Sequence, residues 1–298
     1  MSHVTGAATP SDESIAALRA HPRFREAAAI AASANVEFYQ GNWLANRVLN
    51  DRARFVITQF CMYLHHTRRP DDPKSGLTAA RMREMCLDHK ICSAGRAEAM
   101  LLMMRAGGYL LRETVAEDKR VRRYIPTEKL VGLVRERQKR ILRGADMLER
   151  EPRFVAALES DPDFHARFVA NMVESILTGF RMVRFVPELE RIFERDGGLI
   201  IMMSVFLTGP AYRGFAAAQN VSVFGLARRF QVSRAHVRAV LGDAEQAGLI
   251  RRGGDVVEPL PALGDAIERL LAVGFAYAAL CANRALRQSS RPVSSLAS

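Results

Sequence analysis

Two arginines one helical turn apart, Arg234 and Arg238, are the residues of this chain whose spacing most directly suggests chemistry. A guanidinium group donates two parallel hydrogen bonds, so it can hold a phosphate or the N7 and O6 edge of a guanine. At the exposed start of a helix, such side chains are typical of helices that enter the major groove of DNA. Ser233, Arg234, His236 and Arg238 are therefore candidate DNA-binding residues.

A pair of short helices would have to position these side chains. Ser222 can cap a first helix that runs to about Phe230. After a short turn, Ser233 can cap a second helix, which Gly248 ends. The second helix has apolar residues at spacings of three and four, which we expect to pack on the first helix: Val237, Val240, Leu241 and Ala244.

The residues that follow this helix pair favour a β-hairpin. Residues 249–252 read as a strand, residues 253–255 as a turn, and residues 256–258 as a returning strand that Pro259 closes. A helix-turn-helix followed by a hairpin is a winged helix with a short wing. The alternative is a surface pair of helices whose arginines are only solvated.

The same plan occurs about 140 residues earlier in the chain, which indicates an internal duplication. Residues 93–110 align with residues 233–250, and residues 78–86 align with residues 222–230 as the first helix of the motif, followed by a turn about four residues longer. Ser93 and Arg96 then take the places of the candidate residues on the second helix. Upstream, His21-Pro22-Arg23-Phe24 resembles Asp161-Pro162-Asp163-Phe164 at nearly the same offset.

The hairpin of the first copy is longer and more basic. Residues 109–113 and 121–125 read as its strands, with a turn at residues 116–119, and Thr127 can cap the next helix. We expect this tip to reach the DNA backbone or minor groove, although a charged tip can also serve only to keep an edge strand soluble. The candidate DNA-binding residues of the tip are Lys119, Arg120, Arg122 and Arg123.

Residues 107–130, GGYLLRETVAEDKRVRRYIPTEKL, resemble the winged-helix hairpin of MarR-type transcriptional regulators. The resemblance is best over residues 55–142 and weaker over residues 199–286. It implies that Arg120 and Arg122 contact DNA and that Asp118 orients them. It also implies a small aromatic acid as an effector, bound between the helices of the dimer and the winged domain.

Since a MarR-type subunit resembles one half of this chain in length, the resemblance implies a fused pair. The expected fold is mainly α, with two winged helix-turn-helix units whose small β-hairpins form the wings, and with flanking helices that build an intrachain pseudo-dimer. The units would span residues 1–150 and 151–298, with winged helices at about 55–126 and 199–262. Helices near 24–50 and 128–149 would then pack against helices near 164–194 and 265–286, and the operator would be asymmetric.

The charge of the chain fits a polyanionic partner. The net charge is +11, and residues 1–150 hold 26 Lys and Arg against 17 Asp and Glu, whereas residues 151–298 hold 17 against 15. We expect double-stranded DNA as the partner, bound mostly by the first unit and more weakly at high salt. A replication initiator with tandem winged helices and a protein-interaction scaffold are the alternatives. Further self-association of the pseudo-dimer stays open.

Other classes of function find little support in the sequence. The polar start of the chain and the lack of a long apolar run predict a cytoplasmic protein without a membrane partner. No catalytic motif, cofactor loop or metal-ligand spacing is apparent, so we expect no enzyme, cofactor or zinc site. His65 and His66 read as surface residues, and residues 199–207 as a buried helix. Four aromatic side chains lie near the expected interface between the halves: Phe38, Tyr39, Trp43 and Phe180.

Overall fold

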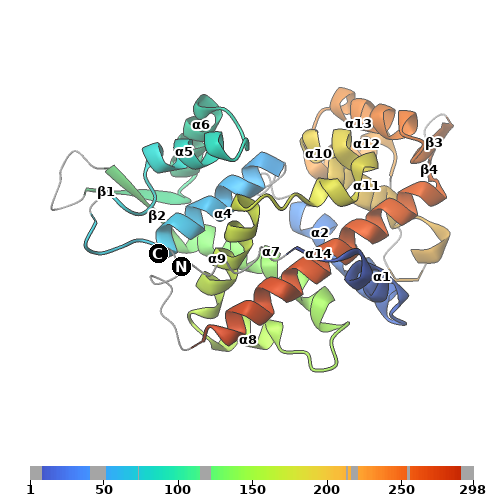
Figure 1. The fold of residues 1–298 in the computed structure, drawn as a ribbon. Coiled ribbons are helices and arrows are strands. Elements are labelled where there is room, and N and C mark those ends of the chain that lie inside the picture. Colours follow the sequence, from blue (N-terminus) through green and yellow to red (C-terminus); the bar gives the residue numbers. More distant parts are fainter. Residues whose placement is uncertain are drawn as a thin grey trace.

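Helices and two short β-hairpins make up the described part of this computed structural model (Figure 1). The structure describes residues 9–40, 52–72, 74–114, 122–212, 214–215, 221–253 and 256–289. The first half of the chain contains α1 (Asp12–Ala20), α2 (Phe24–Tyr39), α4 (Arg52–His66), α5 (Ala79–Asp88), α6 (Ala94–Ala106), β1 (Leu110–Thr114), β2 (Arg122–Pro126) and α7 (Glu128–Asp146). The second half contains α8 (Phe154–Ser160), α9 (Phe164–Leu177), the 3-10 helices η1 (Met182–Phe185) and η2 (Pro187–Leu189), α10 (Glu190–Glu194), α11 (Gly198–Phe206), the 3-10 helix η3 (Pro210–Tyr212), α12 (Val223–Phe230), α13 (Arg234–Gln246), β3 (Ile250–Gly253), β4 (Val256–Pro259) and α14 (Pro261–Arg287).

The prediction of a mainly α fold with two small β-hairpins is confirmed. Each hairpin is a two-stranded antiparallel sheet, β1 with β2 and β3 with β4. From cap to cap, the first helix pair is four residues longer than the second, and the extra residues lie partly in the helix and partly in the turn. α5 has 10 residues where α12 has 8, so half of the insertion lengthens the helix and the rest lengthens the turn.

Equivalent backbone hydrogen bonds occur in the two halves. Gly108 and Gly248 have φ angles of 72° and 69°, the left-handed conformation that ends a helix at low cost in glycine. After each glycine the next amide closes the helix end, at 2.8 Å from Tyr109 to the Met104 carbonyl and at 2.9 Å from Leu249 to the Ala244 carbonyl. The two turns that precede α6 and α13 also share a left-handed residue, Lys90 (φ 52°) in one and Gln231 (φ 54°) in the other.

The helices of the two halves interleave. α4 packs on α9 of the other half, and α11 packs reciprocally on α2. In the same way α8 packs on α7, and α1 packs on α14. In Figure 1 the pairs α5–α6 and α12–α13 lie at the upper left and upper right, with α7, α9 and α14 beneath and between them. Of the contacts expected between the outer helices of the two halves, those of α14 with α7 and with α2 are present, whereas α9 packs on α4 instead.

The first residues after each hairpin define the equivalence of α7 and α14. The amide of Thr127 donates to the Tyr109 carbonyl and that of Leu260 donates to the Leu249 carbonyl, each at 3.0 Å. With Thr127 matched to Leu260, Ile141 is equivalent to Gly274. These two residues face each other, because a Cβ atom added to Gly274 would lie 3.2 Å from Ile141 Cδ1. Two copies of a unit related by a pseudo-two-fold axis bring equivalent residues into contact only near that axis. The contact of Ile141 with Gly274 therefore places the axis where α7 crosses α14.

The helices expected near 164–194 begin with α9 at Phe164 and end with α10 at Glu194. Between them lie a break at Gly179 (φ 103°) and two 3-10 turns. Thr127 precedes α7, but its hydroxyl does not cap the helix; it donates to the Gly108 carbonyl at 2.9 Å. The buried helix expected at residues 199–207 is confirmed as α11, in which all residues except Leu199 are buried. No helix in the described ranges is both long and apolar enough to cross a membrane.

Candidate nucleic-acid interface

Four hydroxyl side chains begin the helices of the two candidate motifs. Thr78 and Ser222 accept hydrogen bonds from backbone amides in the first turns of α5 and α12. Ser93 accepts from the Arg96 amide at 3.3 Å, and Ser233 accepts from the His236 amide at 3.1 Å. Because these serines satisfy amides that the helix leaves unpaired, they hold the starts of α6 and α13 in place. Ser93 and Ser233 are therefore N-cap residues, and both are also exposed to solvent.

The start of α6 is exposed, while its other face is buried. Ser93 and Arg96 are exposed, whereas Ala97, Met100, Leu101 and Met104 belong to the core. One pair of side chains joins the two helices of this motif, with Arg83 Nη1 2.6 Å from Glu98 Oε1. Arg96, the cation at the start of α6, therefore lies on the solvent side of the motif.

The hairpin residues of the first half divide into three groups. Lys119 and Arg120, together with Asp118, lie outside the described residues. Arg122 is exposed at the start of β2. Arg123 is 3% exposed, which corrects its expected place on a solvent-facing tip.

Burial of Arg123 follows from its partners at the base of the hairpin. Its Nε atom donates to the Ser75 carbonyl at 3.2 Å, and its Nη1 atom lies 3.3 Å from Glu113 Oε2. The adjacent Tyr124 amide donates to the Leu77 carbonyl at 2.8 Å. Arg123 therefore fastens the hairpin to the segment that leads into α5. Nothing in the local sequence distinguishes it from Arg122, because Ser75 is distant in the chain.

The start of α13 carries the matching set in the second half. Arg234 and Arg238 are exposed, and Val237, Val240 and Leu241 face the core, as the apolar spacing predicts. The Arg234 guanidinium carbon lies 5.9 Å from the centre of the Phe224 ring, a weak cation–π contact. His236 is half-buried, and its Nε2 atom lies 2.6 Å from the Asp196 carbonyl oxygen. His236 is thus engaged by its own chain.

The hairpin of the second half carries arginines that the sequence reasoning did not select. Arg251 lies 3.6 Å from Glu258 on the facing strand. Arg252 lies 2.5 Å from Glu245 near the end of α13. Both arginines are exposed. Pairing with carboxylates lowers the positive charge that this hairpin offers to a polyanion.

Two aromatic residues of the sequence analysis line a cavity of about 260 Å³ between the halves. Tyr39 and Phe180 belong to its wall, whereas Phe38 packs edge-on against Tyr39 with ring centres 5.1 Å apart. Trp43 lies outside the described residues. The wall combines α2, α4 and α7 of the first half with α9, α11 and α14 of the second. Sequence reasoning did not locate this cavity.

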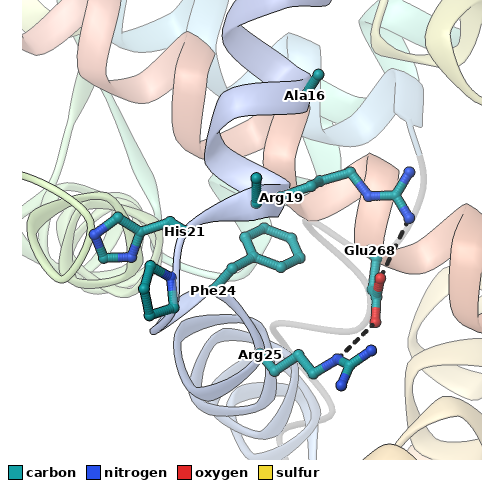
Figure 2. A pocket seen from close by; sticks show the side chains of 8 residues that line it. Ala16, Arg19, His21, Phe24, Arg25 and Glu268 are labelled. Carbon is teal, nitrogen blue, oxygen red and sulfur yellow. Dashed lines mark hydrogen bonds and ion pairs between the residues drawn. The ribbon is translucent and has the colours of Figure 1, made fainter.

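A second, polar pocket lies where α1 meets α14. Figure 2 shows Glu268 between Arg19 and Arg25, and the ion pairs measure 3.3 Å and 3.9 Å. Glu268 also accepts a hydrogen bond of 2.6 Å from the Tyr212 hydroxyl, and Asp265 pairs with Arg19 at 2.7 Å. The charged side chains of this pocket pair with one another, and the ion pairs of Arg19 with Asp265 and Glu268 hold α1 on α14 of the other half.

The cysteines and histidines carry no metal site in the part of the chain that the structure describes. Cys86 lies near the end of α5 and Cys92 lies in the turn before α6. Burial raises the pKa of the Cys86 thiol to about 12, with Cys92 adding to the shift. His66 is not the surface residue that the sequence suggested. Its ring lies 5.9 Å from that of His165 on α9, and burial lowers the pKa of His66 to about 4.

Comparisons with protein-family models, with curated proteins and with solved structures found no match. Assignment of function therefore rests on the geometry of the two helix pairs and of the cavity between them.

Proposed function

We propose that this protein is a sequence-specific regulator of transcription that binds double-stranded DNA through two winged helix-turn-helix units. The observation that carries the proposal is the duplicated unit of two capped helices and a hairpin. In each copy a helix buries one face and presents a serine and an arginine at its exposed start, Ser93 with Arg96 and Ser233 with Arg234. Amide groups and guanidinium groups gathered at a helix start suit phosphate and base edges.

The two units differ in charge, which supports unequal roles. The first unit has the more basic half of the chain and exposes Arg122 at the start of β2. In the second unit, Arg251 and Arg252 pair with glutamates. We therefore infer that the first unit supplies most of the affinity, and that the operator is asymmetric because the two readers differ.

Selection from a random DNA pool at two salt concentrations tests the proposal directly. We expect recovery of an asymmetric motif of about one to two helical turns, with much weaker retention at high salt as counterions are released. The absence of retained DNA at either salt concentration would refute the proposal. Retention without a shared motif would refute sequence-specific regulation.

Point variants then assign the contacts. Arg96→Ala and Arg234→Ala should each weaken binding to the selected site by about 1–3 kcal/mol if the side chain reads a base. Arg150→Ala is the matched control, because Arg150 is exposed beyond the end of α7. Fluorescence anisotropy gives the dissociation constants. Loss equal to that of the control would remove the residue from the interface.

A protein-binding role for the second unit is the second candidate, and the pairing of Arg251 and Arg252 favours it. Deletion of residues 151–298 would be a poor test, because α4 packs on α9 and α11 packs on α2. The variant Arg234→Ala/Arg238→Ala in the full chain is better. Unchanged DNA affinity together with an unchanged sequence motif would support this candidate.

A further inference from the structure

The two hairpins differ at one equivalent position near their base. They end in Pro126 and Pro259, each of which pairs with the first residue of its partner strand. Counting back from these prolines, Arg123 of β2 is equivalent to Val256 of β4. Arg123 is 3% exposed, whereas Val256 is 68% exposed. The first hairpin is therefore covered at a position where the second is open to solvent.

The loop between α4 and α5 covers the Arg123 side chain. Ser75, whose carbonyl accepts from Arg123 Nε, is itself held in place, because its Oγ atom accepts from the Arg69 amide at 3.0 Å. Gly76 has a φ angle of 88°, and a Cβ atom there would lie 3.2 Å from Arg123 Nε. Thr78 forms an antiparallel β-bridge with Arg123. The loop thus pairs with β2 and leaves no space between itself and the guanidinium.

A carboxylate on the facing strand balances the charge of Arg123. Glu113 Oε2 lies 3.3 Å from Arg123 Nη1 and 3.8 Å from Arg68 Nη1. Removal of one partner of a buried ion pair leaves an uncompensated charge, so these contacts resist separation of the hairpin from the loop. In the second hairpin, Gly253 faces Val256. Neither side chain carries a charge, so this anchor belongs to the first hairpin.

Burial of Arg123 determines where Arg122 points. Successive side chains of a strand point to opposite faces, so Arg122 is turned away from the loop, and it is exposed. A side chain that is already ordered before binding saves the entropic cost of ordering it in the complex. In the sequence, the residue equivalent to Arg122 in the second hairpin is Asp255.

We propose that Arg123 is a positioning residue for DNA binding by the first unit. It holds the hairpin on the loop before α5 and thereby keeps Arg122 ready to contact a phosphate, while Arg123 itself does not touch DNA. This inference rests on the proposed DNA-binding function. It supplies a physical reason for the greater affinity that we assign to the first unit, because the anchor preorders the first hairpin.

Hydrogen exchange of the full chain without DNA tests the anchor. In Arg123→Met, a neutral side chain of similar length replaces the guanidinium. We expect the Tyr124 amide, which donates to the Leu77 carbonyl, to exchange about tenfold faster, while the amides of α13 keep their rates. Arg112→Met removes an exposed charge from β1 and is the matched control, for which we expect no change. Unchanged exchange of the Tyr124 amide in Arg123→Met would overturn the proposal.

The salt dependence of affinity for the selected DNA site separates positioning from contact. Each phosphate contact contributes about 0.9 to the slope of log K against the logarithm of salt concentration. We expect Arg122→Ala to weaken binding and to lower this slope by about 1. Arg123→Met should weaken binding about tenfold with an unchanged slope, because the hairpin then has to be ordered on binding. A slope lowered by about 1 in Arg123→Met would indicate a phosphate contact and overturn the proposal.

Gly76→Ala repeats the test without removing a charge. Its new Cβ atom would crowd Arg123 Nε, and the φ angle of 88° is strained for alanine, so we expect weaker binding with an unchanged slope. Arg123→Lys, which keeps a charge beside Glu113, should restore part of the affinity lost in Arg123→Met. If Arg123→Met fails to fold, Gly76→Ala and Arg123→Lys decide.

The outcomes also distinguish this inference from the proposed function. Unchanged DNA affinity in Arg123→Met and in Gly76→Ala would overturn the positioning role alone. Lack of DNA binding by the unaltered protein would refute the DNA-binding function, and the positioning role with it.

Discussion

The half-buried His66 and the buried His165 make the stability of this protein sensitive to acid. His66 on α4 and His165 on α9 lie where the first half packs on the second, with ring centres 5.9 Å apart. The Nε2 atoms of both rings are buried without a hydrogen-bond partner in the described ranges. Burial lowers the pKa of His66 to about 4 and that of His165 to about 3, with lesser contributions from His65 to the former and from His66 and Arg135 to the latter.

The sign of the effect follows from these lowered pKa values. Well above pH 6.5, the ordinary histidine pKa, both rings are neutral in the folded and unfolded states, so they cost the folded protein no stability. As the pH falls below 6.5, the unfolded chain takes up protons that the folded chain excludes. At pH 5 this difference costs about 2 kcal/mol for each histidine, because one pKa unit corresponds to about 1.4 kcal/mol. The two together amount to about 4 kcal/mol, a large part of the stability of a typical domain.

Urea unfolding at pH 7.5 and pH 5 measures this loss. We expect the free energy of unfolding to fall by several kcal/mol in the unaltered protein and by much less in the double variant His66→Leu/His165→Leu. His21→Asn, which lies away from the cluster, is the control and should behave like the unaltered protein. An equal decrease in the double variant and the unaltered protein would refute the reasoning, because the loss would then come from other groups.

Three further predictions concern packing and chemistry. Ser233→Ala should lower the free energy of unfolding by about 1 kcal/mol, because the α13 cap is lost, as urea titration would reveal. Gly144→Ala should destabilise the protein by about 1–3 kcal/mol, since the new Cβ would lie 2.2 Å from Phe275 Cε1. Gly132→Ala on the same helix should stabilise the protein by about 1 kcal/mol, because a Cβ there meets no neighbour, and thermal unfolding distinguishes the two variants. Cys281, whose pKa burial raises to about 12, should react with a thiol reagent only after unfolding, and rapid reaction of the folded protein would contradict its burial.

Local signals in the sequence were sufficient for the helix pairs and hairpins. Ser222, Ser233 and Gly248 mark helix ends because capping and left-handed conformations depend on residues within one turn. The apolar spacing of α13 likewise gave the buried face. The duplication was visible because these signals recur at a nearly constant offset. For the candidate interface, the exposed positions of Arg96 and Arg234 agree with this local reasoning.

Long-range packing decided the rest. Arg122 and Arg123 are adjacent and identical in type, yet one is exposed and the other is buried against Ser75 and Glu113. His66 was expected at the surface, but α9 of the other half covers it.

By itself, the sequence therefore determined the two helix pairs and their hairpins, since their caps, turns and apolar spacing depend on near neighbours in the chain. Only the tertiary structure decided which polar groups are buried, and it created the cavity between Gln138 and Leu271. The physical reason is that burial and cavity shape depend on contacts between segments far apart in the chain, which no local pattern encodes.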